Sequence, residues 1–235
     1  MNGYGRRAAQ TGREGRDERD SRDSRAEADF WTLVGPDFAG KSTLLGRLHD
    51  DHGWHVISYD DRYLDGHPLI RELRRQWVDD AFAWTGRRYT AELVLSVLHP
   101  IVLHLRDELA RAGGRERVIV DSYYYKLLAK CRLLGVDHPP LFDYWRSFPR
   151  PRGVLYLDLP PEEGWLRSRR GAALNAFEHH GALAEHAGFV RLQSELRTAV
   201  LAEVEGLPVT VVDATASPAS VLAQALACLG MAVAR

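Results

Sequence analysis

Short apolar runs alternate with longer amphipathic segments along most of the chain. Five runs have the length and the β-branched or aromatic content of buried strands, at 30–34, 54–58, 118–121, 154–158 and 209–212. Segments with helical spacing lie between and after them, at 42–49, 68–84, 90–112, 123–134, 141–148, 160–170, 188–205 and 218–229. Pro100 falls inside one of these helices, where we expect a kink or a break. Alternating strands and helices predict an α/β fold, a five-stranded parallel sheet covered by helices on both faces.

The first 29 residues lack this pattern. They interleave seven arginines with seven acidic residues, and Tyr4 is their only aromatic residue. Such a segment buries too little apolar surface to offset the entropy of ordering the chain. We therefore expect a disordered charged tail over 1–29 and a single folded domain over 30–235.

Composition narrows the function class. The 235 residues are 45% hydrophobic and carry a formal net charge of −1, which argues against nucleic acid or an anionic membrane as a partner. No apolar run reaches the ~18 residues of a spanning helix and no signal peptide opens the chain, so we expect a cytoplasmic protein. The two cysteines are too few for a disulfide framework or a cysteine zinc site. His99 and His104, five apart on one predicted helix, do not share a face closely enough for a metal pair.

One segment fits the phosphate-loop pattern GxxxxGK[ST] and lies between an apolar strand and a helix, at Gly35-Pro36-Asp37-Phe38-Ala39-Gly40-Lys41-Ser42. Its glycines let the backbone wrap around phosphate, and its amide hydrogens and the helix N-terminus present positive dipole. We expect Lys41 to reach the β- and γ-phosphates and the Ser42 hydroxyl to bind Mg²⁺. Lysine is scarce, with Lys41, Lys126 and Lys130 against 28 arginines, so a lysine here supports the assignment.

The magnesium ion needs a carboxylate as well. Asp121 ends the third predicted strand, and open α/β sheets bind ligands at the carboxyl ends of their strands. An aspartate at that place can also serve as a helix cap. We predict that Asp121 and Ser42 hold the metal. No Asn-Lys-x-Asp motif for reading guanine is present.

Four segments resemble, in order, the thymidylate kinase family of nucleoside monophosphate kinases. They are 35–43, 121–125, 155–163 followed by Arg167, Arg169 and Arg170, and 189–191 with 211–214. The resemblance spans roughly 30–228 and implies a P-loop NTPase-type three-layer fold with a mobile lid. It further implies an ATP-dependent phosphotransferase, and it suggests a homodimer formed through the long helices.

The same resemblance assigns site residues. Asp37 would contact the sugar hydroxyl of the acceptor, and lid arginines would stabilise the transferring group because Phe38 stands where part of the family has an arginine. The implied nucleotide-binding residues are Gly35, Asp37, Phe38, Ala39, Gly40, Lys41, Ser42, Thr43 and Arg167. Together with the phosphate-loop motif and with Asp60, which is discussed below, the predicted catalytic residues are Lys41, Asp37, Asp60, Arg167 and Arg170. A solvated helix face is the other interpretation of the lid arginines.

The departures from the family concern the acceptor. Ser122 replaces the arginine of an Asp-Arg-Tyr motif, 98–100 lacks an acceptor-side arginine, and carboxylates follow the second strand at 59–63. A phosphate acceptor needs cations, whereas a hydroxyl acceptor needs a base. Asp60 resembles the catalytic aspartate of hydroxyl-directed P-loop kinases. We therefore predict a nucleoside-like or other small hydroxyl acceptor, bound by Asp37, Asp60, Arg62 and Tyr123.

Two alternatives remain open. A thymidylate kinase is compatible with Lys126 as a substitute charge and with a clamp drawn from Arg62, Arg71, Arg74, Arg75, Arg87 and Arg88. A decayed, ATP-binding regulatory protein is mildly favoured by Ser122 and opposed by the intact 40–43.

Overall fold

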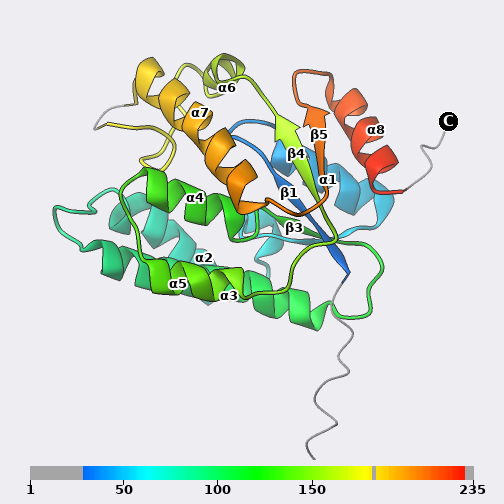
Figure 1. The fold of residues 1–235 in the computed structure, drawn as a ribbon, viewed down its shortest axis with the longest axis horizontal. Coiled ribbons are helices and arrows are strands. Elements are labelled where there is room, and N and C mark those ends of the chain that lie inside the picture. Colours follow the sequence, from blue (N-terminus) through cyan, green and yellow to red (C-terminus); the bar gives the residue numbers. More distant parts are fainter. Residues whose placement is uncertain (1–28, 182–183, 231–235) are drawn as a thin grey trace, which may run out of the picture.

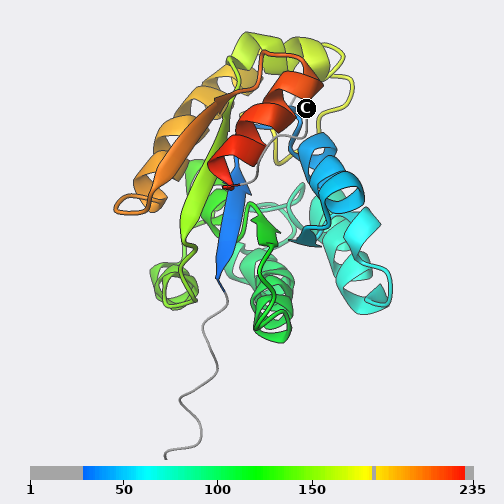
Figure 2. The same ribbon diagram turned by 90° about the vertical axis from the view of Figure 1, so that its right-hand side faces the viewer.

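The computed structural model describes residues 29–181 and 184–230, and its centre is one parallel sheet (Figures 1 and 2). The strand order is β2-β3-β1-β4-β5, and every pairing is parallel. The strands are β1 (Phe30–Val34), β2 (His55–Ile57), β3 (Val118–Asp121), β4 (Gly153–Asp158) and β5 (Val209–Asp213). The predicted five-stranded parallel sheet is therefore confirmed.

Helices cover both faces of the sheet, as expected of a parallel sheet. They are α1 (Lys41–His52), α2 (Pro68–Gln76), α3 (Ala91–Arg111), α4 (Tyr125–Leu133), α5 (Pro139–Arg146), α6 (Pro161–Arg167), α7 (His186–Glu203) and α8 (Pro218–Cys228), with a 3-10 turn η2 (Asp61–Tyr63) and a π-helical turn η3 (Trp77–Ala81). None of the helices in the described part of the chain has the length and apolarity needed to cross a bilayer.

Alternate residues of the central strands enter two separate cores. Leu33, Ile119 and Leu155 pack with α1 and α8 on one face. Val34, Val120 and Val154 pack on the other face, in a larger core to which α3, α4, α5 and α7 contribute. This period of two is the pattern of a strand buried on both sides, so the apolar runs of the sequence are explained by the two layers of helices.

Several predicted boundaries move. The predicted helix 68–84 becomes α2 followed by the π-helical η3, and the predicted helix 160–170 already ends at Arg167. α3 runs unbroken through Pro100, so the expected break is absent. Proline removes one helical hydrogen bond, but α3 buries residues on both sides of that position, and this packing outweighs the loss. Except for residue 29, the predicted charged tail lies outside the described residues.

Candidate active site

The loop between β1 and α1 has the backbone conformation that a phosphate site requires. Gly35 has φ 152°, and a Cβ there would lie 2.6 Å from the carbonyl oxygen of Leu157 on the neighbouring strand β4. Phe38 and Gly40 adopt left-handed conformations, with φ 62° and 90°. Left-handed residues within a turn produce a concave row of amides that suits an anion. α1 begins directly afterwards, at Lys41, and its N-cap residue Gly40 has no side chain to occupy the helix N-terminus.

Lys41 lies folded along this loop. Its Nζ donates to the carbonyl oxygens of Gly35, at 3.3 Å, and Pro36, at 2.8 Å. Lys41, Ser42 and Thr43 line one cavity. The ammonium group is thereby held at the loop, where the sequence predicts that the β- and γ-phosphates bind.

Two cavities adjoin the loop, one on each side. The first, of about 400 Å³, lies between the loop, α3, α4 and the segment 175–178. The second, of about 420 Å³, lies between the loop, α1, Arg167 and the connection from β5 to α8. Phe38, Gly40 and Thr43 line both. A loop with a ligand space on each side is the arrangement needed to move a phosphoryl group from one molecule to another.

The lid arginines separate in the structure. Arg167 reaches from α6 to the second cavity, where it donates to the carbonyl oxygens of Phe38, at 3.4 Å, and Ala214, at 2.8 Å. Arg169 and Arg170 have left-handed φ values of 57° and 55°, and they line neither cavity. Arg170 is therefore not among the residues that line the cavities beside the loop, and its catalytic role stays a prediction.

Asp121 and Ser42 line the first cavity together. The Asp121 carboxylate accepts hydrogen bonds from the hydroxyls of Ser58, at 2.8 Å, and Ser122, at 2.9 Å. Within the described ranges it has no cationic partner, although it is buried. A buried carboxylate oriented by two hydroxyls, beside a further hydroxyl, is a set of hard oxygen ligands that fits Mg²⁺.

Asp60 lies next to this carboxylate. Its side chain accepts from the backbone N–H of Arg62, at 3.2 Å, and so caps η2. Its own N–H donates to the hydroxyl of Ser58, the residue that also donates to Asp121. Ser58 therefore ties the ends of β2 and β3 together and fixes Asp60 at the edge of the first cavity.

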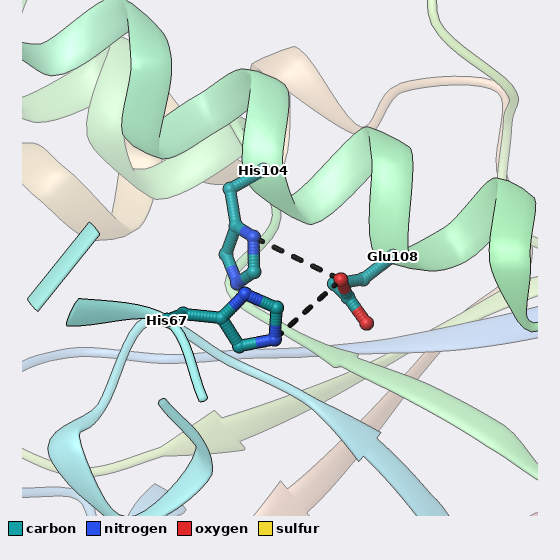
Figure 3. Close-up of side chains that lie close together, drawn as sticks. All are labelled: His67, His104 and Glu108. Carbon is teal, nitrogen blue, oxygen red and sulfur yellow. Dashed lines mark ion pairs between the residues drawn. The ribbon is translucent and has the colours of Figure 1, made fainter. Parts of the chain in front are cut away.

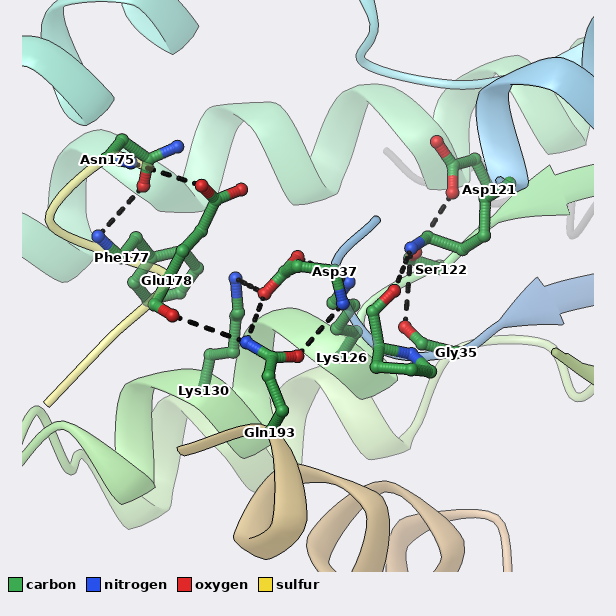
Figure 4. Close-up of polar contacts among 12 residues, drawn as sticks. Gly35, Asp37, Asp121, Ser122, Lys126, Lys130, Asn175, Phe177, Glu178 and Gln193 are labelled. Atoms are coloured by element: carbon green, nitrogen blue, oxygen red, sulfur yellow. Dashed lines mark hydrogen bonds and ion pairs between the residues drawn. The ribbon is translucent and has the colours of Figure 1, made fainter. Parts of the chain in front are cut away.

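Asp37 is the centre of a buried ion cluster (Figure 4). Its carboxylate lies 2.7 Å from the Nζ atoms of both Lys126 and Lys130, and Gln193 donates to it at 2.8 Å. The backbone N–H of Asp37 donates in turn to the side-chain oxygen of Gln193, at 2.9 Å. Burial raises the pKa of Asp37, but Lys126, Lys130 and Lys41 lower it by more. All three lysines of the chain therefore act on one carboxylate.

The two deeper lysines are affected by the same burial. Burial lowers the pKa of Lys126 to about 8, against the opposing influence of Asp37. Burial likewise lowers the pKa of Lys130, where Asp37 again opposes the shift. Asp37 lines the first cavity, but its oxygens are already engaged with these partners. Its contact with an acceptor sugar stays a prediction.

The segment after α6 covers the first cavity. The Phe177 ring packs edge-on against Trp77 and Phe82, with centroids 4.6 and 4.5 Å apart, and Lys130 Nζ lies 4.6 Å from the Phe177 centroid. Glu178 lines the same cavity, where burial and Asp37 raise its pKa. Three aromatic rings thus hold the segment 175–178, the lid segment, over the first cavity.

Two predicted acceptor-binding residues are elsewhere. Arg62 pairs with Asp50 of α1, at 2.6 Å, and does not line the first cavity. Tyr123 is fully buried among Phe30, Tyr124 and other rings, and its hydroxyl has no hydrogen-bond partner in the described part of the chain. Neither side chain lines the first cavity, so the geometry lends no support to their binding the acceptor. Tyr123 has φ 46°, which turns the chain before α4 and sends the side chain into the core.

Other residues of the site escaped the sequence analysis. They are Ser58, Trp77, Lys130, Glu178 and Gln193. Arg74, one of the arginines predicted as a possible phosphate clamp, does line the first cavity. The scarcity of lysine was a usable signal for Lys130. Gln193 carries no such signal, because a glutamine inside an amphipathic helix has the same pattern whether it faces water or a buried aspartate.

Comparison with known proteins agrees with this geometry. No family model matches the chain. A thymidylate kinase of Xanthomonas euvesicatoria pv. vesicatoria (strain 85-10) is 33% identical over 210 residues, covering 86% of this chain and 83% of the relative. A thymidylate kinase of Xanthomonas campestris pv. campestris (strain B100) is 32% identical over 207 residues, with the same coverage.

Solved structures show the same fold. A deoxyadenosine kinase from M. mycoides, with the products dCMP and dCDP bound, has a TM-score of 0.59 at 14% identity and covers 86% of this chain and 98% of its own. The same kinase with dATP bound has a TM-score of 0.57 at 15% identity, with 86% and 99% covered. With a phosphate loop between two cavities and relatives of this identity and coverage, the chain belongs to the thymidylate kinase family.

Proposed function

We propose that this protein transfers the γ-phosphate of ATP to a hydroxyl group of a nucleoside-like acceptor. ATP extends from the second cavity, beside Arg167, along the phosphate loop. The acceptor occupies the first cavity, under the lid segment. The kinases to which the chain is similar support the use of ATP, and the residues that line the first cavity support the choice of acceptor.

The charges that line the first cavity carry the proposal. Among the described residues, four cations and four carboxylates line it, so its formal charges balance; they are Lys41, Lys126, Lys130 and Arg74 with Asp37, Asp60, Asp121 and Glu178. Lys126 and Lys130 are paired with Asp37, and Arg74 pairs with Asp61 at 3.3 Å. A dianionic monophosphate beside ATP would find little uncommitted positive charge here, whereas a neutral acceptor needs none.

The remaining lining supports a flat, partly apolar acceptor. Trp77, Val78, Leu98 and Ile101 contribute apolar surface, and Phe177 faces the same space from the lid segment. Aromatic and aliphatic walls with a few convergent polar groups are typical of sites for small organic ligands. A nucleobase on the apolar side would leave its sugar toward Asp60 and the phosphate loop.

The residues then divide the reaction among them. Asp60 accepts the proton of the acceptor hydroxyl as its oxygen attacks the γ-phosphorus and the bond to the bridging oxygen breaks, which releases ADP. Lys41 and the loop amides stabilise the charge on the transferring group, and Arg167 adds to this from the ATP side. Ser42 and Asp121 hold Mg²⁺, which when bound neutralises and orients phosphate oxygens.

Phosphorylation of thymidylate is the second candidate. The names of the curated relatives favour it, as does the presence of Arg74 in the cavity. A decayed ATP-binding protein is a third outcome, opposed by the intact loop.

The test compares acceptors and variants by ADP release with Mg²⁺ and ATP. We expect turnover with thymidine or deoxyadenosine but not with thymidylate. Asp60→Asn should lower kcat by about 10²-fold, the smaller end of what a general base contributes. The control Asp65→Asn changes an exposed carboxylate of the same segment, which pairs with Arg71, and should leave kcat unchanged. Turnover of thymidylate at ~1–100 s⁻¹, as is usual for kinases, would overturn the proposal. ATP binding without turnover of any acceptor would favour the decayed protein.

A further inference from the structure

A second group of chemically capable side chains lies outside the active site, between α2 and α3 (Figure 3). His104 and Glu108 are four residues apart on α3, so they project from one face of the helix. His67 immediately precedes α2, and its imidazole packs against the imidazole of His104. Among the described residues, these three form the one group whose potential ligand atoms are close enough for a metal ion, all within 4.8 Å of one another.

The distances are near those of a bound ion. Glu108 Oε1 lies 3.7 Å from His67 Nε2 and 4.0 Å from His104 Nδ1. Ligand atoms held at ~2.0–2.2 Å around a tetrahedral zinc ion lie roughly 3.4 Å apart. Side-chain rotations would bring the Glu108 oxygen roughly 0.3–0.6 Å closer to each nitrogen and would bring the two ring nitrogens, which lie within 4.8 Å of each other, to the same spacing. We propose that His67, His104 and Glu108 bind one divalent transition-metal ion, of which Zn²⁺ is the best match.

The donor types favour this class of ion. Two imidazoles and one carboxylate suit zinc and its neighbours in the first transition row, whereas Mg²⁺ and Ca²⁺ prefer oxygen ligands alone. The two imidazole rings lie with centroids 4.6 Å apart, so two nitrogen ligands come from neighbouring positions. Three protein ligands leave a fourth position for water.

The local surroundings also limit the site. Arg111 pairs with Glu108, so the ion would share that carboxylate with a cation. Arg111 is largely exposed and lies one turn beyond Glu108, so its guanidinium can turn toward solvent without losing a buried contact. His104 is buried and His67 and Glu108 are partly exposed, so the ion would enter from the side of His67.

The position of the site gives it a function in the fold. His67 starts the α2–η3 segment, which carries Arg74 and Trp77 into the acceptor cavity. α3 carries Leu98 and Ile101 into the same cavity, about one turn before His104. An ion that joins the start of α2 to α3 would restrain the wall of the cavity that carries most of its apolar surface. This is a structural site, separate from the phosphate chemistry.

The test uses the untagged full-length protein, freed of metal by a chelator, and Zn²⁺ itself as the probe. A chromophoric zinc indicator measures stoichiometry and affinity by competition. We expect one equivalent of Zn²⁺ in the wild type and at least tenfold weaker binding in His104→Gln and Glu108→Gln. The matched control is His52→Gln, which changes a histidine at the end of α1 and should bind as the wild type does.

Thermal unfolding provides an independent readout. The Tm of the wild type and of the control should rise with Zn²⁺ concentration, and the Tm of Glu108→Gln should not. Because Glu108 is partly exposed, this variant keeps the proposal testable even if replacing the buried His104 impairs folding. Less than one equivalent in the wild type, or equal affinity in the wild type and Glu108→Gln, would overturn the proposal. So would zinc binding that is lost only when ATP and Mg²⁺ compete, because that result would place the ion at the phosphate loop.

Discussion

The buried cluster around Asp37 makes a quantitative prediction about stability. Asp37→Asn removes the negative charge that contacts both Lys126 and Lys130 and leaves two buried ammonium groups with a neutral partner at that position. Removing one partner of a buried ion pair costs about 3–5 kcal/mol, mainly because the other charge stays buried. For a protein of this size each 1 kcal/mol shifts Tm by ~2–4 °C, so we expect a loss of roughly 6–20 °C at pH 7.

The dependence on pH separates this cause from a general disturbance of the loop. Both lysines have lowered pKa values, which the loss of Asp37 lowers further. Near pH 10 Lys126, whose pKa is about 8, is neutral in the folded state of either protein, and less positive charge remains for Asp37 to balance. The difference between variant and wild type should therefore be largest at or below pH 7 and should narrow toward pH 10.

The assay is chemical unfolding followed by circular dichroism at pH 7 and pH 10. Asp158→Asn is the matched control, because Asp158 pairs with the half-exposed Arg197 at 3.0 Å and such surface pairs contribute at most about 1 kcal/mol. A loss below about 1 kcal/mol for Asp37→Asn at pH 7, or an equal loss at both pH values, would refute the reasoning.

Two further predictions concern neighbouring residues. Burial lowers the pKa of Lys126 to about 8, so between about pH 8 and pH 10 the unfolded chain binds a proton that the folded chain does not, and the free energy of unfolding rises with pH over that range. Lys126→Met should flatten this rise in a series of unfolding curves measured at different pH values. An unchanged slope would contradict the assignment of the lowered pKa to Lys126. Tyr123→Phe removes a buried hydroxyl that has no partner in the described part of the chain, so we expect the free energy of unfolding to increase by about 1 kcal/mol. The KM for the acceptor should stay the same. A tenfold higher KM would show that Tyr123 contacts the acceptor after all.

The fold and the phosphate loop could be predicted because their signals are local. The strands are apolar runs bounded by polar residues, and the loop needs glycines and a lysine at fixed spacing, so 35–42 and the order of the elements followed from neighbouring residues alone. The place of Asp121 beside the loop followed from a rule of the same kind, because the end of a strand in a parallel sheet is a defined place. Its role as a metal ligand stays a prediction.

The acceptor side was predicted less well because it depends on direction and on distant contacts. Tyr123 and Arg62 follow strands that end at the cavity, but neither side chain enters it. A left-handed φ turns Tyr123 into the core, and an ion pair with α1 holds Arg62. Gln193 and Glu178 come from segments more than 130 residues after the loop, and only the folded chain brings them to Asp37. Side-chain direction at a turn and pairing across such separations leave no periodic trace in a sequence.

Phe38, Gly40 and Thr43 line both cavities, so the partition between the first and the second cavity is only one loop thick. A single molecule with a nucleoside at each end of a polyphosphate chain would therefore span both chambers and follow the loop throughout. The affinity for this molecule would depend on both cavities at once. Shortening its polyphosphate by one phosphate at a time would show how many phosphates are needed to connect the two cavities.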